Sequence, residues 1–214
     1  MLSIIVAYYN NKSYENLLID FEKEKEDELL DDIFYIIYNK SWNIIDLKIP
    51  NLIILDVNNI GREGETYLNH IINYYEKLDD FTLFIQDDVN NHIVNNKEFI
   101  LITNEIMKQN IDFYQYPVTW KEGDKTIHRR QVIQGYCNLH TLGDPFAIKN
   151  ACTRLGLQLP EIYITFTCAF FILNKRRIYR HNKLFYIKCR EWLLEDEKNG
   201  FILELLWYII FGDL

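Results

Sequence analysis

The 214-residue sequence is poor in several residue types, and each shortage excludes a class of protein. Its 8 glycines and 4 prolines are too few for a collagen-like, linker-rich or low-complexity chain. Its 23 basic residues face 31 acidic ones, which gives a formal net charge of −8. Proteins that bind a duplex normally carry a basic surplus, so we do not expect a nucleic acid as the main partner.

Cysteines and long apolar runs are also scarce. The four cysteines form no C-x-x-C pair, so we expect reduced thiols in a cytoplasmic protein. The most apolar stretches, 162–173 and 201–211, are shorter than the ~20 residues that span a bilayer, so no transmembrane segment is expected. The first residues lack a basic region and a small-residue cleavage site, which favours a first strand over a signal peptide.

Apolar residues make up 49% of the chain and aromatic residues 15%, enough to bury a substantial core. Short apolar runs rich in β-branched residues predict strands buried on both faces. These runs cover residues 3–9, 33–38, 52–57 and 81–85. Amphipathic helical segments at 13–32 and 65–78 lie between them, so the pattern predicts an α/β fold with a mostly parallel sheet.

The second half of the chain is less regular. Residues 112–140 are polar and are expected to form loops, whereas 163–173 form one long apolar run and predict one strong strand. Four segments predict helices: 99–110, 145–155, 185–195 and 201–211. No repeat or linker divides the sequence, so residues 1–214 are expected to form one domain.

Two adjacent acids, Asp87 and Asp88, directly follow the apolar run 81–85. The carboxyl ends of parallel strands are where ligands bind in open α/β sheets. Two close carboxylates repel each other unless a cation compensates, and Mg²⁺ and Mn²⁺ prefer such oxygen ligands. His92 is close enough in sequence to be a further ligand. The alternative is a polar turn after a strand, with His92 in a structural role.

The segment 61–67 (GREGETY) precedes a predicted helix and contains Arg62. Its glycines allow close approach of the backbone, the helix start favours an anion, and a guanidinium suits a diphosphate. The segment matches neither the dinucleotide-binding pattern nor a P-loop. An ordinary helix start is the alternative.

Two further candidates follow later in the chain. Lys175 and Arg176, with Arg177, come directly after a strong strand and could meet a phosphate, or they could form a solvated helix start. Glu204 is an acid on an otherwise apolar helix, either at its wet edge or held inside for a purpose. These residues suggest a phosphorylated ligand bound through a metal, without naming the reaction.

Several segments resemble, in order, a family of glycosyltransferase-like domains that includes the N-terminal domain of a chlorella-virus glycosyltransferase. They span most of the chain, and the GREG stretch is the most specific. The segments are 36–40 (IIYNK), 59–68 (NIGREGETYL), 84–86 (FIQ), 169–173 (AFFIL) followed by 176–178 (RRI), and 204–212 (ELLWYIIFG).

The resemblance implies a GT-A-type fold, with residues 1–95 as the nucleotide-binding half and 96–214 as the acceptor-side half. It implies a Mn²⁺ or Mg²⁺ ion, a UDP-sugar donor such as a UDP-hexose or UDP-deoxyhexose, and a glycan or glycoprotein acceptor. A viral relative also implies the cytoplasm of an infected host cell as a location, and further domains in a longer chain.

The same resemblance assigns roles to residues. The end of the first strand would contact the nucleotide, through Ala7, Tyr8, Tyr9 and Asn10. Asp87 and Asp88 would hold the metal, although many relatives have Gln-Gly or another pairing where this chain has Gln-Asp-Asp. Arg62 would neutralise donor phosphate or brace the acids. If the reaction inverts the anomeric carbon, a carboxylate must deprotonate the acceptor, and Glu204 is the candidate.

The residues leave two other functions open. One is another metal-dependent phosphoryl or nucleotidyl enzyme that uses the same acids, although the charge of −8 counts against it. The other is a non-catalytic module that binds a nucleotide or carbohydrate. Such a module would tolerate the loss of Asp87 and Asp88.

Overall fold

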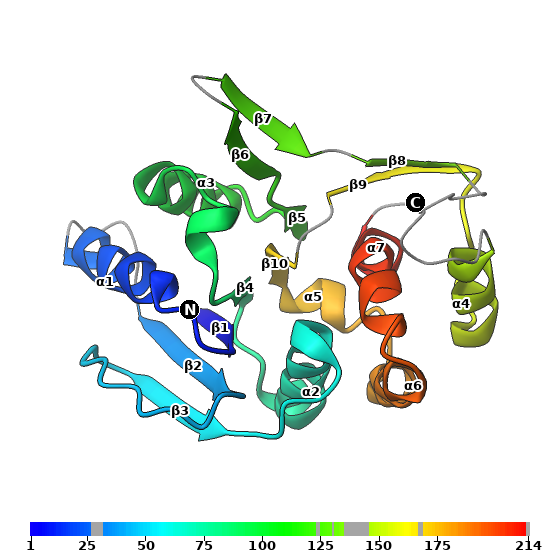
Figure 1. Cartoon of the computed structure of the whole chain (residues 1–214), viewed down its shortest axis with the longest axis horizontal. Helices are drawn as coiled ribbons and strands as arrows, with labels where there is room; N and C mark the ends of the chain where they lie inside the picture. Colours follow the sequence, from blue (N-terminus) through cyan, green and yellow to red (C-terminus); the bar gives the residue numbers. More distant parts are fainter. Residues whose placement is uncertain (27–31, 123–124, 130, 135–145, 167–168, 213–214) are drawn as a thin grey trace.

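The computed structural model describes residues 1–26, 32–122, 125–129, 131–134, 146–166 and 169–212. A six-stranded mixed sheet forms its centre, with helices on both faces (Figure 1). In spatial order the strands are β3 (Leu52–Asp56), β2 (Ile33–Asn39), β1 (Leu2–Tyr8), β4 (Phe81–Gln86), β10 (Phe171–Asn174) and β5 (Phe113–Gln115). Strands β1 to β4 are parallel, and β10 runs antiparallel to its neighbours β4 and β5.

Strand β1 shows why the parallel strands are apolar throughout. Side chains alternate between the two faces of a strand, and helices cover both faces here. Ile4, Val6 and Tyr8 join the core on one face, and Ile5 and Ala7 join the core on the other. The predicted α/β class and the mostly parallel sheet are confirmed.

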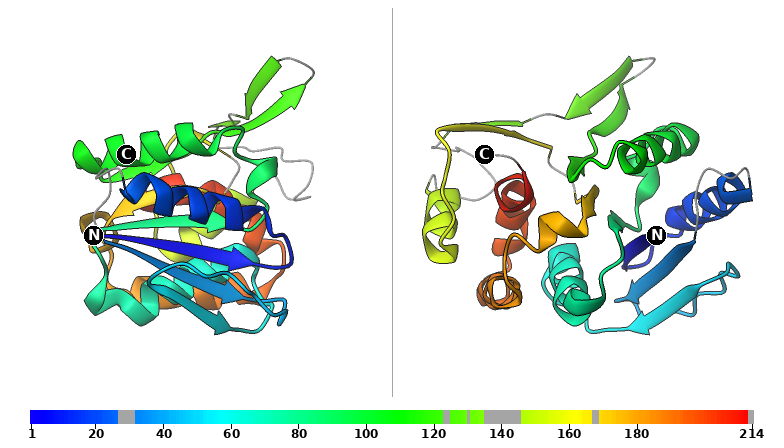
Figure 2. Two further views of the ribbon diagram at one scale, coloured as in Figure 1. Left: turned by 90° about the vertical axis from the view of Figure 1, so that its left-hand side faces the viewer. Right: turned by 180° about the vertical axis from the view of Figure 1, so that it is seen from behind.

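Two groups of helices lie on opposite sides of the sheet, as the right-hand view in Figure 2 shows. One face carries α1 (Ser13–Glu26) and α3 (Asn96–Lys108). The other face carries α2 (Arg62–Tyr74), α6 (Lys183–Glu195) and α7 (Asn199–Phe211), with α4 (Ala147–Leu155) beyond them. Three short turns of helix complete the set: η1 (Tyr75–Lys77), η2 (Val89–Asn91) and α5 (Lys175–Ile178).

Residues 112–140 contain more strand than the sequence indicated. Besides β5, they form a two-stranded ribbon of β6 (Val118–Glu122) and β7 (Lys125–Arg129), which projects at the top of Figure 1. A second ribbon pairs β8 (Gln131–Gln134) with β9 (Ile162–Thr165). The prediction of a loop-rich segment is therefore wrong for these residues.

The predicted single strand over 163–173 is also wrong, because the run divides between two sheets. Strand β9 pairs with β8, whereas β10 enters the central sheet. Gln115 of β5 holds the chain where β9 ends. Its Nε2 donates to the carbonyl of Phe166 at 2.6 Å, and its Oε1 accepts from the Thr165 hydroxyl at 3.1 Å. Both are contacts between distant parts of the chain, which an apolar pattern does not contain.

Cys152 and Cys189 are buried free thiols, whereas Cys137 and Cys168 lie outside the described residues. Across the described ranges, every helix is too short or too polar to cross a bilayer. The chain order reverses at β1, which has β2 on one side and β4 on the other. Such a reversal, at the carboxyl ends of the strands, is where open α/β sheets bind ligands.

Candidate functional site at the carboxyl edge of the sheet

Asp87 joins the end of β4 to the loop after β1. Its Oδ2 atom accepts three backbone hydrogen bonds, from the N–H groups of Tyr9, Asn10 and Asn11 at 2.7, 2.8 and 2.8 Å. The Ser13 hydroxyl donates to the Asp87 carbonyl at 2.9 Å. The residue is only 4% exposed. A carboxylate with this many donors on one oxygen shapes the loop, so Asp87 is a positioning residue for the end of β1.

Asp88 is differently placed and half-buried. Its Oδ2 lies 3.1 Å from Nε2 of His92, one turn along the chain. Its Oδ1 is buried and has no hydrogen-bond partner among the described residues. Burial alone would raise the pKa of the Asp88 carboxyl, but hydrogen bonds from His92 and Asn91 outweigh burial and hold it below its usual value. The carboxylate is therefore ionised at neutral pH and has one oxygen to offer.

The side chains of Asp88 and His92 fit a divalent cation that a bound ligand would also coordinate. Within the ranges that the structure describes, no group of three or more His, Cys, Asp or Glu side chains could hold a metal ion. Asp88 and His92 supply two donor atoms, and Asp87 is committed to backbone N–H groups. Mg²⁺ commonly takes one or two carboxylates and completes its shell with phosphate oxygens and water. The donor set suits that type of site and not an all-protein cage.

The first two residues of the GREG stretch, at the start of α2, have a left-handed backbone conformation. Gly61 has φ +61° and Arg62 has φ +56°, which is uncommon for a residue with a side chain. Gly64 packs against α7, where an added Cβ would lie 2.8 Å from a Leu203 methyl carbon. One glycine thus makes the turn and the other allows close helix packing. Helix α2 therefore begins at Arg62, earlier than the predicted 65.

Lys40, at the end of β2, holds this turn in place. Its Nζ donates to the carbonyl oxygens of Ile60 and Arg62, both at 2.7 Å, and to Oε2 of Glu65 at 3.3 Å. All three ammonium protons are therefore used. Burial lowers the pKa of Lys40, while the Glu65 charge acts in the opposite direction. Arg190 of α6 donates to the other Glu65 oxygen from Nε at 3.0 Å and from a terminal nitrogen at 2.8 Å.

The Arg62 side chain lies between acids and an aromatic ring. Its guanidinium is 3.3 Å from Glu204 of α7 and 3.5 Å from Glu63. Its carbon Cζ lies 4.1 Å from the centre of the Phe201 ring. The side chain of Arg62 is 41% exposed, so it can still meet a ligand. The structure thus brings together Arg62 and Glu204, which are 142 residues apart.

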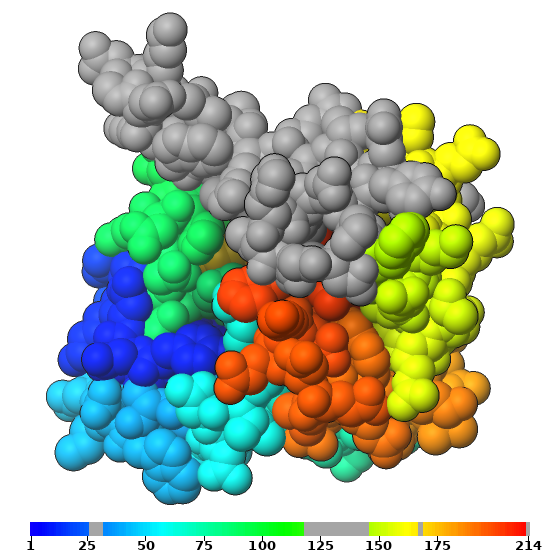
Figure 3. Space-filling model, turned by 45° about the vertical axis from the view of Figure 1, so that its right-hand side comes forward, coloured from blue at the N-terminus to red at the C-terminus, as the bar shows by residue number. Residues whose placement is uncertain are grey.

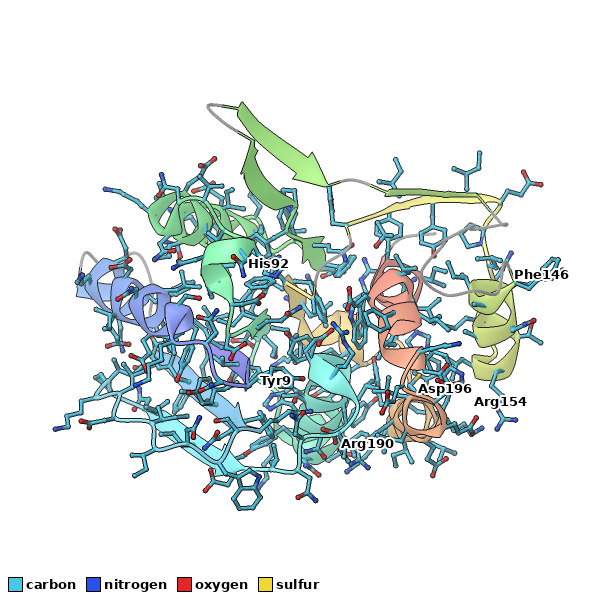
Figure 4. All side chains as sticks on the ribbon, in the orientation of Figure 1. Tyr9, His92, Phe146, Arg154, Arg190 and Asp196 are labelled. Carbon is cyan, nitrogen blue, oxygen red and sulfur yellow. The ribbon has the colours of Figure 1, made fainter. Side chains whose placement is uncertain are left out.

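Tyr9 connects the acidic loop with the Arg62 turn. Its ring lies 5.6 Å from Nζ of Lys40, and its hydroxyl is buried without a hydrogen-bond partner among the described residues. Burial, together with the negative charges of Glu63, Asp87 and Glu65, raises the pKa of Tyr9. Figure 4 shows Tyr9 between β1 and the start of α2, and Figure 3 shows these segments meeting α7 on one face.

Two of the predicted nucleotide-binding residues, Lys175 and Arg176, are not part of this site. Ala7 and Tyr8 end β1 at the site, but their side chains are buried, and the centre of the Tyr8 ring lies 5.4 Å from that of Tyr14. Lys175 and Arg176 follow β10, which runs against β4, so they lie at the opposite edge of the sheet. There Lys175 pairs with Asp80 at 2.9 Å, and Arg176 pairs with Asp112 at 2.7 Å. The reversed direction of β10 is the reason for this correction.

Sequence reasoning missed the roles of Lys40, Glu65 and Arg190. Lys40 ends an apolar run, and a lysine at that position resembles an ordinary solvated strand end. Its position inside the resembling stretch 36–40 was the one available signal. Glu65 resembled an acid in a first helical turn, and Arg190 a polar residue on an amphipathic helix.

Comparisons with known proteins give a family and a distant structural likeness. No curated protein matches the sequence. Among solved structures, the galactosyltransferase LgtC in complex with donor and acceptor sugar analogs is similar, with a TM-score of 0.41 and 12% sequence identity. The alignment covers 96% of this chain and 70% of that one. The family model described as "Protein of unknown function (DUF3431)" matches residues 23–214, and the chain therefore belongs to this family.

Proposed function

We propose that the protein is a metal-dependent glycosyltransferase that transfers a sugar from a nucleotide-sugar donor, a UDP-sugar, to a glycan acceptor. One observation carries the proposal. At the strand reversal, a loop held by Asp87 lies beside Asp88, whose second oxygen is buried without a partner. The resemblance of the GREG and neighbouring segments to glycosyltransferase-like domains supports it.

Asp88 and His92 would hold the ion, Mn²⁺ or Mg²⁺. When bound, such an ion offsets the negative charge that develops on the departing nucleoside diphosphate. Asp87 acts through the loop: it fixes Tyr9 and Asn10 where they can contact the nucleotide. Because Asp87 already accepts three N–H groups, Asp88 is the acid that we assign to the metal.

Arg62 would bind a phosphate of the donor through its exposed guanidinium. We assign Glu204 a positioning role toward Arg62. Its carboxylate lies 3.3 Å from the guanidinium and can orient it toward the donor. The Phe201 ring and Glu63 restrict the same guanidinium from other sides.

The test is calorimetric titration of UDP with and without Mn²⁺, combined with an assay for slow hydrolysis of UDP-galactose and UDP-glucose. We expect Mn²⁺-dependent binding and hydrolysis, both lost in Asp88→Asn. Asp46→Asn is the matched control, because Asp46 is 82% exposed and pairs only loosely with Lys48 at 3.9 Å. Metal-independent UDP binding that survives in Asp88→Asn would favour a non-catalytic module, and absence of UDP binding would overturn the proposal.

A further inference from the structure

Trp42 is a large aromatic residue presented to solvent in an unusual backbone conformation. It is 65% exposed and has φ +59°, in the left-handed region. A bulky side chain at positive φ is uncommon and is disfavoured by about 1 kcal/mol or more, so the surrounding structure must hold it there. Strain of this kind on an exposed aromatic residue points to a function outside the core.

The buried amide of Asn39, at the end of β2, holds this turn. Its Oδ1 accepts from the backbone N–H of Ser41 at 3.2 Å, and its Nδ2 donates to the carbonyl of Asn43 at 2.9 Å. The residues on both sides of Trp42 are therefore fixed by one side chain that is itself 2% exposed. The same Nδ2 donates to Oδ1 of Asp56 at 2.7 Å, which ties the turn to the end of β3.

A pocket of about 310 Å³ opens beside Trp42, at the lower end of the range for small-molecule sites (~300–1,000 Å³). Its lining combines the aromatic ring with carboxylate, amide, guanidinium and aliphatic groups from β3, the following loop, α2 and α6. The lining includes Trp42, Asp56, Asn58, Ile60, Asn69 and Arg190. Figure 4 shows Arg190 between α2 and α6.

The charges of the lining do not favour an anionic ligand. Arg190 pairs with Glu65, which also lines the pocket, so these two charges of the lining offset each other. Asp56 then leaves the pocket with a negative surplus. A phosphate or nucleotide would meet repulsion there, whereas hydroxyl groups can donate to Asp56 and exchange hydrogen bonds with the amides of Asn58 and Asn69.

We propose that this pocket is a saccharide-binding site for neutral glycans, with Trp42 as the platform for one sugar ring. A rigid aromatic face offers contact area at low entropic cost, and polar groups around it select hydroxyls. Neither Asp88 nor Arg62 lines this pocket, although the Trp42 turn is joined to the loop after β1 by a hydrogen bond from Nδ2 of Asn43 to Oδ1 of Asn10 at 2.8 Å. The role of the pocket in retaining a glycan acceptor rests on the proposed transferase function, whereas binding itself does not.

The test uses an array of neutral, sialylated and sulfated oligosaccharides, with the full chain in EDTA and without UDP, so that it is independent of the transferase proposal. The best oligosaccharide is then titrated in solution. Trp42→Asn is the main variant, since Asn tolerates positive φ and the fold is retained. We expect selective binding of neutral glycans, weakened at least about tenfold in Trp42→Asn and largely kept in Trp42→Tyr.

Ile44→Ala is the matched control, because Ile44 is 90% exposed in the same loop and does not line the pocket; it should bind as the unchanged protein does. Three results would overturn the proposal: no neutral glycan is bound, sialylated or sulfated glycans are preferred, or Trp42→Asn binds with unchanged affinity.

Discussion

The ammonium nitrogen of Lys40 lies 3.3 Å from Oε2 of Glu65, and both side chains are almost wholly buried. The pair connects the end of β2 to the first turn of α2. It also fixes the backbone of the Arg62 turn, because Lys40 binds two carbonyl oxygens there. The shape of the candidate site therefore depends on a charge pair that faces away from solvent.

Replacement of Lys40 by Met should lower the free energy of unfolding by about 3 kcal/mol, because Oε2 of the buried Glu65 carboxylate and two carbonyl oxygens lose their Lys40 donor, while Arg190 still bonds the other Glu65 oxygen. Urea denaturation measures this loss. The double variant Lys40→Met/Glu65→Gln should recover part of the stability, since the buried position then holds no charged oxygen without a donor and the Gln oxygen can still accept from Arg190. A double variant no more stable than the sum of the single effects would contradict this account.

Substitution of Asp87 and of Asp88 should have different effects on stability. Asp87→Ala removes three charge-assisted hydrogen bonds and should lower the free energy of unfolding by about 3 kcal/mol. Asp88→Ala should change it by less than about 1 kcal/mol, because its carboxylate is half-buried and pairs with one imidazole. Denaturation curves and Mn²⁺-dependent UDP binding distinguish the two. Equal losses of stability would show that Asp88 is also a structural acid.

Arg62→Gln should weaken UDP binding about tenfold while changing stability by no more than about 1 kcal/mol, because ion pairs of a partly exposed arginine contribute little to folding. Calorimetry with UDP and Mn²⁺ and thermal unfolding measure the two effects. Arg154→Gln is a suitable control: this exposed arginine pairs with Glu195 at 2.9 Å, away from the site. Comparable losses of affinity and stability would identify Arg62 as a structural residue.

His70 predicts a pH dependence of stability. Burial lowers its pKa to about 3, and the imidazole bonds the Tyr38 hydroxyl at 3.2 Å. Between pH 3 and 6.5 the unfolded chain therefore binds a proton that the folded chain does not, so stability falls as the pH falls through this window.

The loss from His70 should reach about 2 kcal/mol at pH 5 relative to pH 8. His70→Gln should have a correspondingly smaller change between these pH values. Denaturant unfolding at both pH values gives the comparison. An unchanged slope in His70→Gln would show that His70 takes no part in the dependence.

Local patterns predicted the first half of the fold well. Strands β1, β2 and β4 are short apolar runs bounded by polar residues, and their burial on both faces explains that pattern. The run at 52–57 also forms a strand, β3, but β3 is at the edge of the sheet and its isoleucines are partly exposed, so the predicted burial on both faces is wrong for it. The split of 162–174 between two sheets was not predictable, because Gln115 and the pairing with β8 decide it.

The candidate site shows the same division. Asp88, Arg62 and Glu204 were selected from residue type and position, and the structure places Arg62 beside Glu204. The structural role of Asp87 comes from hydrogen bonds with N–H groups 76 to 78 residues earlier in the chain, and local sequence spacing does not predict such contacts. Lys175 and Arg176 followed a strand as predicted, but the reversed direction of β10 takes them to the other edge.

The hydrogen bonds from Lys40 to the backbone have a consequence for protein engineering. Two of the three acceptors of Lys40, at Ile60 and Arg62, are main-chain oxygens, which every amino acid possesses. The Ile60 side chain can therefore be randomised in a directed-evolution library without removing the anchor that shapes its loop, whereas Arg62 is kept for the donor. Donor preference could be altered there by repeated rounds of selection, provided that Lys40 and Glu65 are left unchanged.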